Sequence, residues 1–133
     1  MKANEPALAV VILAAGQGKR MKSGLVKVLH ELCGRPMLAY PIEIAEALAP
    51  ERLVVVIGRD SERVREAFSG RATFVEQTER RGTGHAMMTT RAALDGFSGD
   101  VLILYGDTPL LRAAAIERMR TEKAARGVDL LIL

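Results

Sequence analysis

The chain has 133 residues, of which 49% are hydrophobic and 26% charged, and its formal net charge is +3. These values fit one globular domain, and the small basic excess with only 4% aromatic residues argues against a nucleic-acid-binding surface, which concentrates basic residues in a stripe. The longest unbroken apolar run, residues 7–15, is about half of the ~20 residues needed to span a bilayer, so we expect neither a transmembrane helix nor a membrane partner.

Apolar runs rich in β-branched residues alternate with segments of helical spacing. In chain order they predict a strand at 8–13, a helix at 37–48, a strand at 53–57, a helix at 62–68, a weaker strand at 73–77, a helix at 84–94, a strand at 101–104, a helix at 113–125 and a strand at 128–133. The apolar runs are continuous rather than alternating, which is typical of strands buried on both faces. The pattern therefore predicts an α/β fold, with a mainly parallel sheet and helices on both faces.

Ligands of such sheets bind beyond the carboxyl ends of the strands, so the loop after the first strand is the first place to expect a site. Residues 14–27 contain three glycines and four basic side chains but no acidic one. Small residues allow the backbone to approach a ligand and to turn N–H groups inward, and basic side chains neutralise anions. This loop is therefore predicted to bind phosphate groups.

Two common phosphate-binding motifs do not fit the loop. A P-loop ending at Gly18-Lys19 would have Leu13 in place of its first glycine and Arg20 in place of Ser or Thr. The dinucleotide fingerprint fits Gly16 and Gly18 but places Met21 where its third glycine belongs. The remaining pattern is Leu-Ala-Ala-Gly-x-Gly-x-Arg, followed seven positions later by a lysine.

That pattern resembles the nucleotidyltransferases that make nucleotide sugars. The resemblance is carried by 13–21 (LAAGQGKRM) with 27–30 (KVLH), by 82–86 (GTGHA) and by 104–111 (LYGDTPLL). Together these segments are most similar to the uridylyltransferase domain of bifunctional bacterial enzymes that make UDP-N-acetylglucosamine, and the similarity runs from about residue 8 to residue 133. The resemblance implies a Rossmann-like nucleotidyltransferase fold and uridylyl transfer from UTP to N-acetylglucosamine 1-phosphate in the cytoplasm. The product would serve peptidoglycan and lipopolysaccharide precursor synthesis.

The resemblance also implies roles for individual residues. Arg20 would hold the leaving pyrophosphate and Lys27 the α-phosphate, while Asp107 would be a ligand of Mg²⁺. Gln77 and Gly82-Thr83 would recognise the uracil edge, and Thr83 is also a candidate cap for the helix that follows. The remaining substrate contacts would come from Leu13, Ala14, Ala15 and Gly16 on the uridine side and from Tyr105 and Gly106 on the sugar-phosphate side.

Other polar residues are expected to have structural or solvated roles. His30 and His85 are predicted to pack or to orient loops, since phosphoryl transfer from an anionic nucleophile needs no general base. Cys33, the only cysteine, cannot form an internal disulfide and is expected to be a small buried hydrophobe at a turn. Arg80, with its basic neighbours, is expected on a mixed solvated face because acidic residues interleave with them.

Three departures from the family pattern keep alternatives open. Position 19 is Lys instead of a small polar residue, and Val26 replaces the usual proline before Lys27. The last predicted strand coincides with the end of the sequence, so residues 1–133 are expected to be the nucleotide-binding N-terminal portion of a longer nucleotidyltransferase domain, truncated on its C-terminal side and with no second domain. The alternatives are a nucleotide-binding module without turnover and a related sugar-phosphate or terpenoid-pathway nucleotidyltransferase. The oligomeric state stays open.

Overall fold

The computed structural model describes residues 6–18, 21–59 and 61–133. Its elements are, in chain order, β1 (Leu8–Leu13), a 3-10 helix (Lys27–Leu29), β2 (Glu31–Leu32), β3 (Arg35–Pro36), α1 (Ala39–Ala47), β4 (Arg52–Gly58), α2 (Glu62–Ala67), β5 (Thr73–Gln77), α3 (Thr83–Thr89), β6 (Asp100–Tyr105) and α4 (Ala113–Arg126). Among these described residues, no helix has the length and apolarity that a membrane crossing requires.

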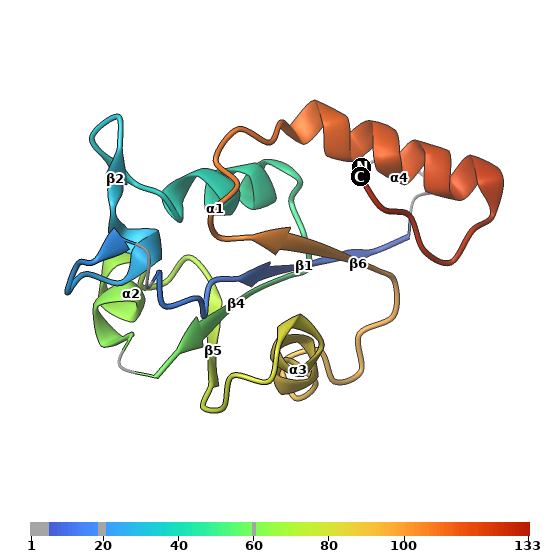
Figure 1. Cartoon of the computed structure of the whole chain (residues 1–133). Coiled ribbons are helices and arrows are strands. Elements are labelled where there is room, and N and C mark those ends of the chain that lie inside the picture. Colours follow the sequence, from blue (N-terminus) through green and yellow to red (C-terminus); the bar gives the residue numbers. More distant parts are fainter. Residues whose placement is uncertain (1–5, 19–20, 60) are drawn as a thin grey trace.

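Four strands form one parallel sheet in the order β5-β4-β1-β6 (Figure 1). In the register of this sheet, Ala9 of β1 pairs with Arg52 of β4 on one side and with Val101 of β6 on the other. The order reverses direction at β1, and at such a point the loops that leave neighbouring strands diverge to opposite faces and open a crevice. The predicted parallel α/β fold is confirmed.

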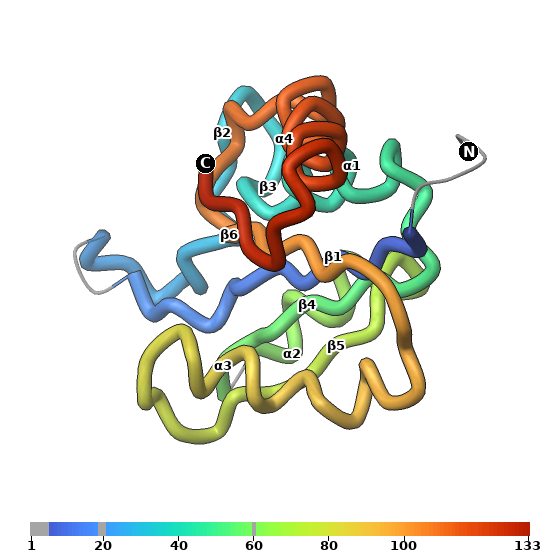
Figure 2. The backbone as a smooth tube through the Cα atoms, turned by 90° about the vertical axis from the view of Figure 1, so that its right-hand side faces the viewer, coloured from blue at the N-terminus to red at the C-terminus, as the bar shows by residue number. Residues whose placement is uncertain are grey.

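Helices cover both faces of the sheet, as Figure 2 shows for α1 and α4 above the strands and α3 below them. Leu8, Val10 and Ile12 of β1 pack in a core that also contains buried residues of α1, α2 and α4. Val11 faces the opposite way and packs with Ala86 of α3. Burial on both faces explains why β1 is an unbroken apolar run.

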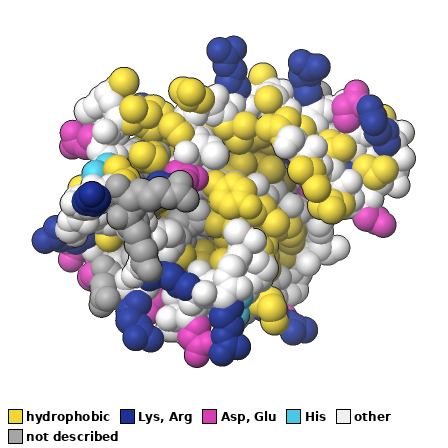
Figure 3. Space-filling view, in the orientation of Figure 1, with side chains coloured by type: hydrophobic (Ala, Val, Ile, Leu, Met, Phe, Trp, Pro, Cys, Tyr) yellow, Lys and Arg dark blue, Asp and Glu magenta, His cyan; other side chains and the backbone are white. Residues whose placement is uncertain are grey.

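Strand β6 is an edge strand of the described sheet, with β1 as its partner on one side. Leu104 is buried, whereas Val101, Ile103 and Tyr105 are 43%, 45% and 47% exposed. These three share the sheet face on which α3 packs, but α3 lies over β1, β4 and β5. Figure 3 shows hydrophobic side chains exposed along the side of the molecule on which β6 runs.

Two predictions of secondary structure are wrong. Residues 128–133 form no strand, and Leu130 and Ile132 are 74% and 81% exposed, because an apolar run becomes a strand only where another strand pairs with it. The helix predicted at 84–94 ends at Thr89; the hydroxyls of Thr89 and Thr90 donate to carbonyls three residues back, and the chain turns from there.

Cys33 is exposed rather than buried. It forms with Gly34 the two-residue turn between β2 and β3, a hairpin that the sequence pattern does not predict. Both residues have positive φ, +52° and +75°, as a tight hairpin turn with the twist of its strands requires. The turn projects its side chains into solvent, which explains the exposure.

Candidate functional site

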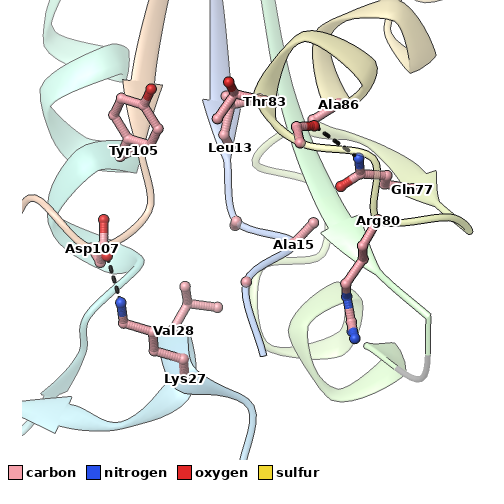
Figure 4. A pocket seen from close by; sticks show the side chains of 13 residues that line it. Leu13, Ala15, Lys27, Val28, Gln77, Arg80, Thr83, Ala86, Tyr105 and Asp107 are labelled. Carbon is pink, nitrogen blue, oxygen red and sulfur yellow. Dashed lines mark hydrogen bonds and ion pairs between the residues drawn. The ribbon is translucent and has the colours of Figure 1, made fainter. Parts of the chain in front are cut away.

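A pocket of about 280 Å³ lies at the carboxyl ends of the central strands, where the crevice was expected. It lies among the loop after β1, the segment after β5 that leads into α3, and the segment after β6 (Figure 4). The residues that line it are Leu13, Ala14, Ala15, Gly16, Lys27, Val28, Gln77, Arg80, Gly82, Thr83, Ala86, Tyr105 and Asp107.

The described part of the loop after β1 turns back against Lys27. Gly18 has φ +59°, and a Cβ at this position would lie 2.7 Å from the Cβ of Lys27, far inside van der Waals contact. Only glycine therefore fits here, on grounds of both backbone conformation and space. This close approach is one of the contacts that position the Lys27 stem beside the loop.

An ion pair closes one side of the pocket. The Lys27 Nζ lies 2.5 Å from the Asp107 Oδ2, with the two side chains 32% and 42% exposed. Figure 4 shows the two groups facing each other on the side of the pocket formed by β6. Asp107 therefore faces the pocket lysine rather than capping its own turn, where Thr108 donates to the Tyr105 carbonyl instead.

The opposite side of the pocket presents a buried amide. Gln77, at the end of β5, is 5% exposed, and its Nε2 lies 3.2 Å from the Gly82 carbonyl oxygen and 3.1 Å from the His85 Nδ1. In Figure 4 the amide oxygen of Gln77 points toward the middle of the pocket, toward Leu13 and Ala15. The pocket thus has a neutral hydrogen-bonding side and a charged side.

Gly82 connects these features to α3. Its φ of +94° is in the left-handed region that favours glycine, and it directly precedes α3. The prediction that Thr83 caps this helix is wrong: Gly82 occupies the N-cap position, no side chain caps the helix, and Thr83 is its first residue. Thr83 lines the pocket instead.

Ten of the twelve residues expected to form the site line this one pocket: Leu13, Ala14, Ala15, Gly16, Lys27, Gln77, Gly82, Thr83, Tyr105 and Asp107. Gly106 is buried behind the lining, where a Cβ would lie 3.0 Å from the Ala14 Cβ and 3.1 Å from the Val28 Cγ1. Arg20 lies outside the described residues. The roles of all twelve stay predictions.

Three lining residues were missed: Val28, Ala86 and Arg80. Arg80 is exposed, as predicted for a solvated face, but it also borders the pocket from the segment between β5 and α3. The signal that could have found it is its position between Gln77 and Gly82, both of which were expected at the site.

Few of the side chains that line the pocket can bind a metal ion. Within the described ranges, no three His, Cys, Asp or Glu side chains are grouped so that they could hold a metal ion together. Among the lining residues the carboxylate is that of Asp107, a hard oxygen ligand. One carboxylate suits Mg²⁺ only where phosphate oxygens and water supply the remaining ligands.

Comparisons with known proteins support this picture. The bifunctional protein GlmU of Geobacter metallireducens is 48% identical over 128 residues, covering 95% of this chain and 27% of that protein, and GlmU of Ruegeria sp. is 52% identical over 128 residues, covering 94% and 28%. The chain thus spans about a quarter of the length of these curated relatives.

Solved structures show the same fold at lower identity. Rv0371c from Mycobacterium tuberculosis H37Rv has a TM-score of 0.77 at 21% identity, covering 92% of this chain and 63% of that one. Its complex with manganese has a TM-score of 0.73 at 19% identity, covering 90% and 60%.

The family itself is shown by a match that covers nearly all of the sequence. Residues 10–133 match the model of the MobA-like NTP transferase domain, and this match, with the GlmU relatives, confirms the resemblance inferred from the loop motifs. The chain belongs to the MobA-like NTP transferase domain family.

Proposed function

We propose that this chain binds UTP and transfers its uridylyl group to N-acetylglucosamine 1-phosphate, with release of pyrophosphate. The observation that carries the proposal is the division of one pocket into a side with the buried Gln77 amide and a side with the charged Lys27 and Asp107. A nucleotide has the same division, with a neutral base at one end and phosphates at the other. The resemblance of residues 13–21, 82–86 and 104–111 to the uridylyltransferases that make UDP-N-acetylglucosamine favours a uridine nucleotide and this sugar phosphate.

The base end is formed by Gln77 and Gly82. Uracil presents an acceptor, a donor and an acceptor along its edge, which an amide oxygen and backbone N–H groups complement. The Gln77 oxygen points into the pocket and can accept from the N3–H of uracil. The backbone at residues 13–16, which also lines the pocket, would contact the uridine, and Tyr105 and Gly106 would border the sugar-phosphate side.

The phosphate end is formed by Lys27 and Arg80, with Asp107 beside them. Lys27 would bind the α-phosphate as a movable point charge, and Arg80 adds positive charge to the rim. Arg20, outside the described residues, is proposed to hold the leaving pyrophosphate. Asp107 is the residue proposed to hold Mg²⁺, which when bound would neutralise negative charge on the phosphates.

The proposed reaction requires side chains that position the two substrates and neutralise their negative charge. An oxygen of the sugar phosphate forms a bond to the α-phosphorus of UTP, and the bond from that phosphorus to the bridging oxygen of pyrophosphate breaks. The nucleophile is already an anion, so no side chain has to remove a proton. Lys27 can neutralise the α-phosphate, where the sugar phosphate and UTP, both anions, must meet. No histidine is needed as a base in this transfer step.

The test separates binding from turnover. Thermal unfolding of the chain with UTP, CTP or dTTP, each with and without Mg²⁺, measures which base stabilises it, because a ligand that binds the native state raises Tm. Pyrophosphate release from UTP and N-acetylglucosamine 1-phosphate measures the transfer. We expect UTP to give the largest shift; an equal shift with all three nucleotides would contradict the uridylyl assignment.

A second candidate function is a nucleotide-binding module without turnover, and the observation that favours it is that the pocket lining supplies one carboxylate, Asp107, for a metal ion. UTP binding without pyrophosphate release would support the module. A larger shift with CTP would support a cytidylyltransferase instead.

A further inference from the structure

We propose that His85 is a positioning residue that sets the base preference of the pocket, because it fixes the orientation of the Gln77 amide. The inference rests on the proposed function, since it concerns the same base-binding side. Its evidence is the set of hydrogen bonds that joins Gln77, Gly82 and His85.

The Gly82 carbonyl determines which end of the Gln77 amide faces it. A carbonyl oxygen only accepts hydrogen bonds, so the amide atom 3.2 Å from it must be the NH₂ group and not the oxygen. The same carbonyl accepts from the backbone N–H of Ala86 at 3.1 Å in the first turn of α3. It is therefore held in place by the helix as well as by Gln77.

His85 engages the same NH₂ group. Its Nδ1 lies 3.1 Å from the Gln77 Nε2, and because that nitrogen donates, the Nδ1 must accept. His85 is therefore neutral in this arrangement, with its ring proton on Nε2. Both N–H bonds of the amide are then occupied, one by Gly82 and one by His85.

The amide oxygen is consequently the group that Gln77 offers to a ligand. Figure 4 shows this oxygen directed into the pocket. An acceptor matches the N3–H of uracil but opposes the N3 of cytosine, which also accepts. If the amide could rotate by 180°, it would offer its NH₂ group and match cytosine; two acceptors on the other side, at Gly82 and His85, oppose that rotation.

Both partners lie on a short stretch of chain that α3 makes rigid. Gly82 is the N-cap residue of the helix and His85 lies in its first turn, so the spacing between the two acceptors is set by helical geometry. Gln77 comes from β5, the neighbouring element. His85 itself is not among the residues that line the pocket, so it acts through Gln77.

The experiment compares two substitutions at one position. His85→Leu removes the acceptor while filling space, whereas His85→Asn places an amide oxygen close to the position of Nδ1. Calorimetric titration of the chain with UTP and with CTP gives the ratio of the two Kd values for each protein. We expect the unmodified chain and His85→Asn to prefer UTP, and His85→Leu to lose about tenfold of that preference, the size of effect expected when one hydrogen bond stops orienting the amide.

Nitrogen NMR of the imidazole rings supplies a second measurement that needs no variant to fold and no ligand. At neutral pH, His85 is expected as the Nε2–H tautomer, and a proton on Nδ1 would overturn the inference. A full UTP preference in His85→Leu would overturn it as well, as would an equal loss in both variants, which would indicate a packing role. Absence of a UTP preference in the unmodified chain would overturn the proposed function and this inference with it.

Discussion

Replacement of Asp107 by Asn is expected to change UTP affinity in opposite directions with and without Mg²⁺. In the structure the Asp107 carboxylate binds Lys27, the lysine proposed for the α-phosphate. In the absence of metal, a phosphate group must compete with this carboxylate for the lysine and must also approach a negative charge. Asp107→Asn removes the repulsion and releases the lysine, so metal-free UTP is expected to bind more tightly.

The size of the gain follows from the exposure of the pair. The bond from Lys27 to a phosphate forms in both proteins and cancels in the comparison. The gain is therefore the ion pair that no longer has to be broken, about 0–1 kcal/mol for side chains 32% and 42% exposed, plus the carboxylate–phosphate repulsion that is removed, about 1 kcal/mol. Their sum, about 1–2 kcal/mol, corresponds to roughly tenfold tighter binding of metal-free UTP. With Mg²⁺ the variant lacks the carboxylate that would hold the metal, and we expect binding about tenfold weaker than that of the unmodified chain.

The assay is titration calorimetry with UTP in EDTA and again in excess Mg²⁺, at one ionic strength because phosphate binding is salt-dependent. Thermal unfolding without nucleotide serves as the control, and the Tm is expected to change little for a pair this exposed. Weakening by the same factor in both buffers would refute the reasoning, since Asp107 would then act on nucleotide binding independently of metal.

Three further predictions concern other parts of the chain. Gly18→Ala should lower both Tm and UTP affinity, since the added methyl would lie 2.7 Å from a side-chain carbon and φ is +59°; Gly24→Ala, with open space and no positive φ, is its matched control and should leave both unchanged. Arg80→Ala should weaken UTP binding by about three- to tenfold in calorimetry with little change in Tm, because the exposed side chain contributes charge to the pocket rather than packing. Two hydrogen bonds from Arg71 lower the pKa of Glu46 below its ordinary value of 4.5, so their stabilisation is present above that pH and is lost as the pH falls through the lowered pKa. Glu46→Gln should therefore flatten the fall of Tm on acidification, and an unchanged pH profile would contradict the assignment.

The sheet could be predicted from the sequence because strands that are buried on both faces consist of continuous apolar residues. β1 and β4 are central and apolar on both faces, and continuous apolar runs gave their positions within a residue or so. The β2–β3 hairpin could not be predicted this way, since it has two-residue strands and a turn in which Cys33 adopts positive φ. The strand predicted at residues 128–133 is wrong for a different reason. These residues have the apolar composition of a strand, but a strand also needs a neighbouring strand to pair with, and composition does not show whether one is present.

The part of the candidate site that could be predicted is the part formed by loops that directly follow strands of the sheet. The carboxyl ends of parallel strands meet at one edge, so residues at and after the ends of β1, β5 and β6 are expected together, and ten of them line one pocket. The pairing of Lys27 with Asp107 and of Gln77 with His85 could not be predicted, because it depends on side-chain directions across the sheet. Arg80 was missed since its acidic neighbours made it resemble an ordinary surface charge.

The central place of β1 in the sheet also means that the sheet depends on contacts between segments far apart in the chain. Both strands that pair with β1 follow it in the sequence, and the second, β6, is separated from it by the whole of β4, α2, β5 and α3. Pairing between such distant segments requires closure of a long loop, which slows folding relative to local contacts. The ion pair between Lys27 and Asp107 joins residues 80 positions apart, so the pocket depends on contacts that carry a high cost of loop closure.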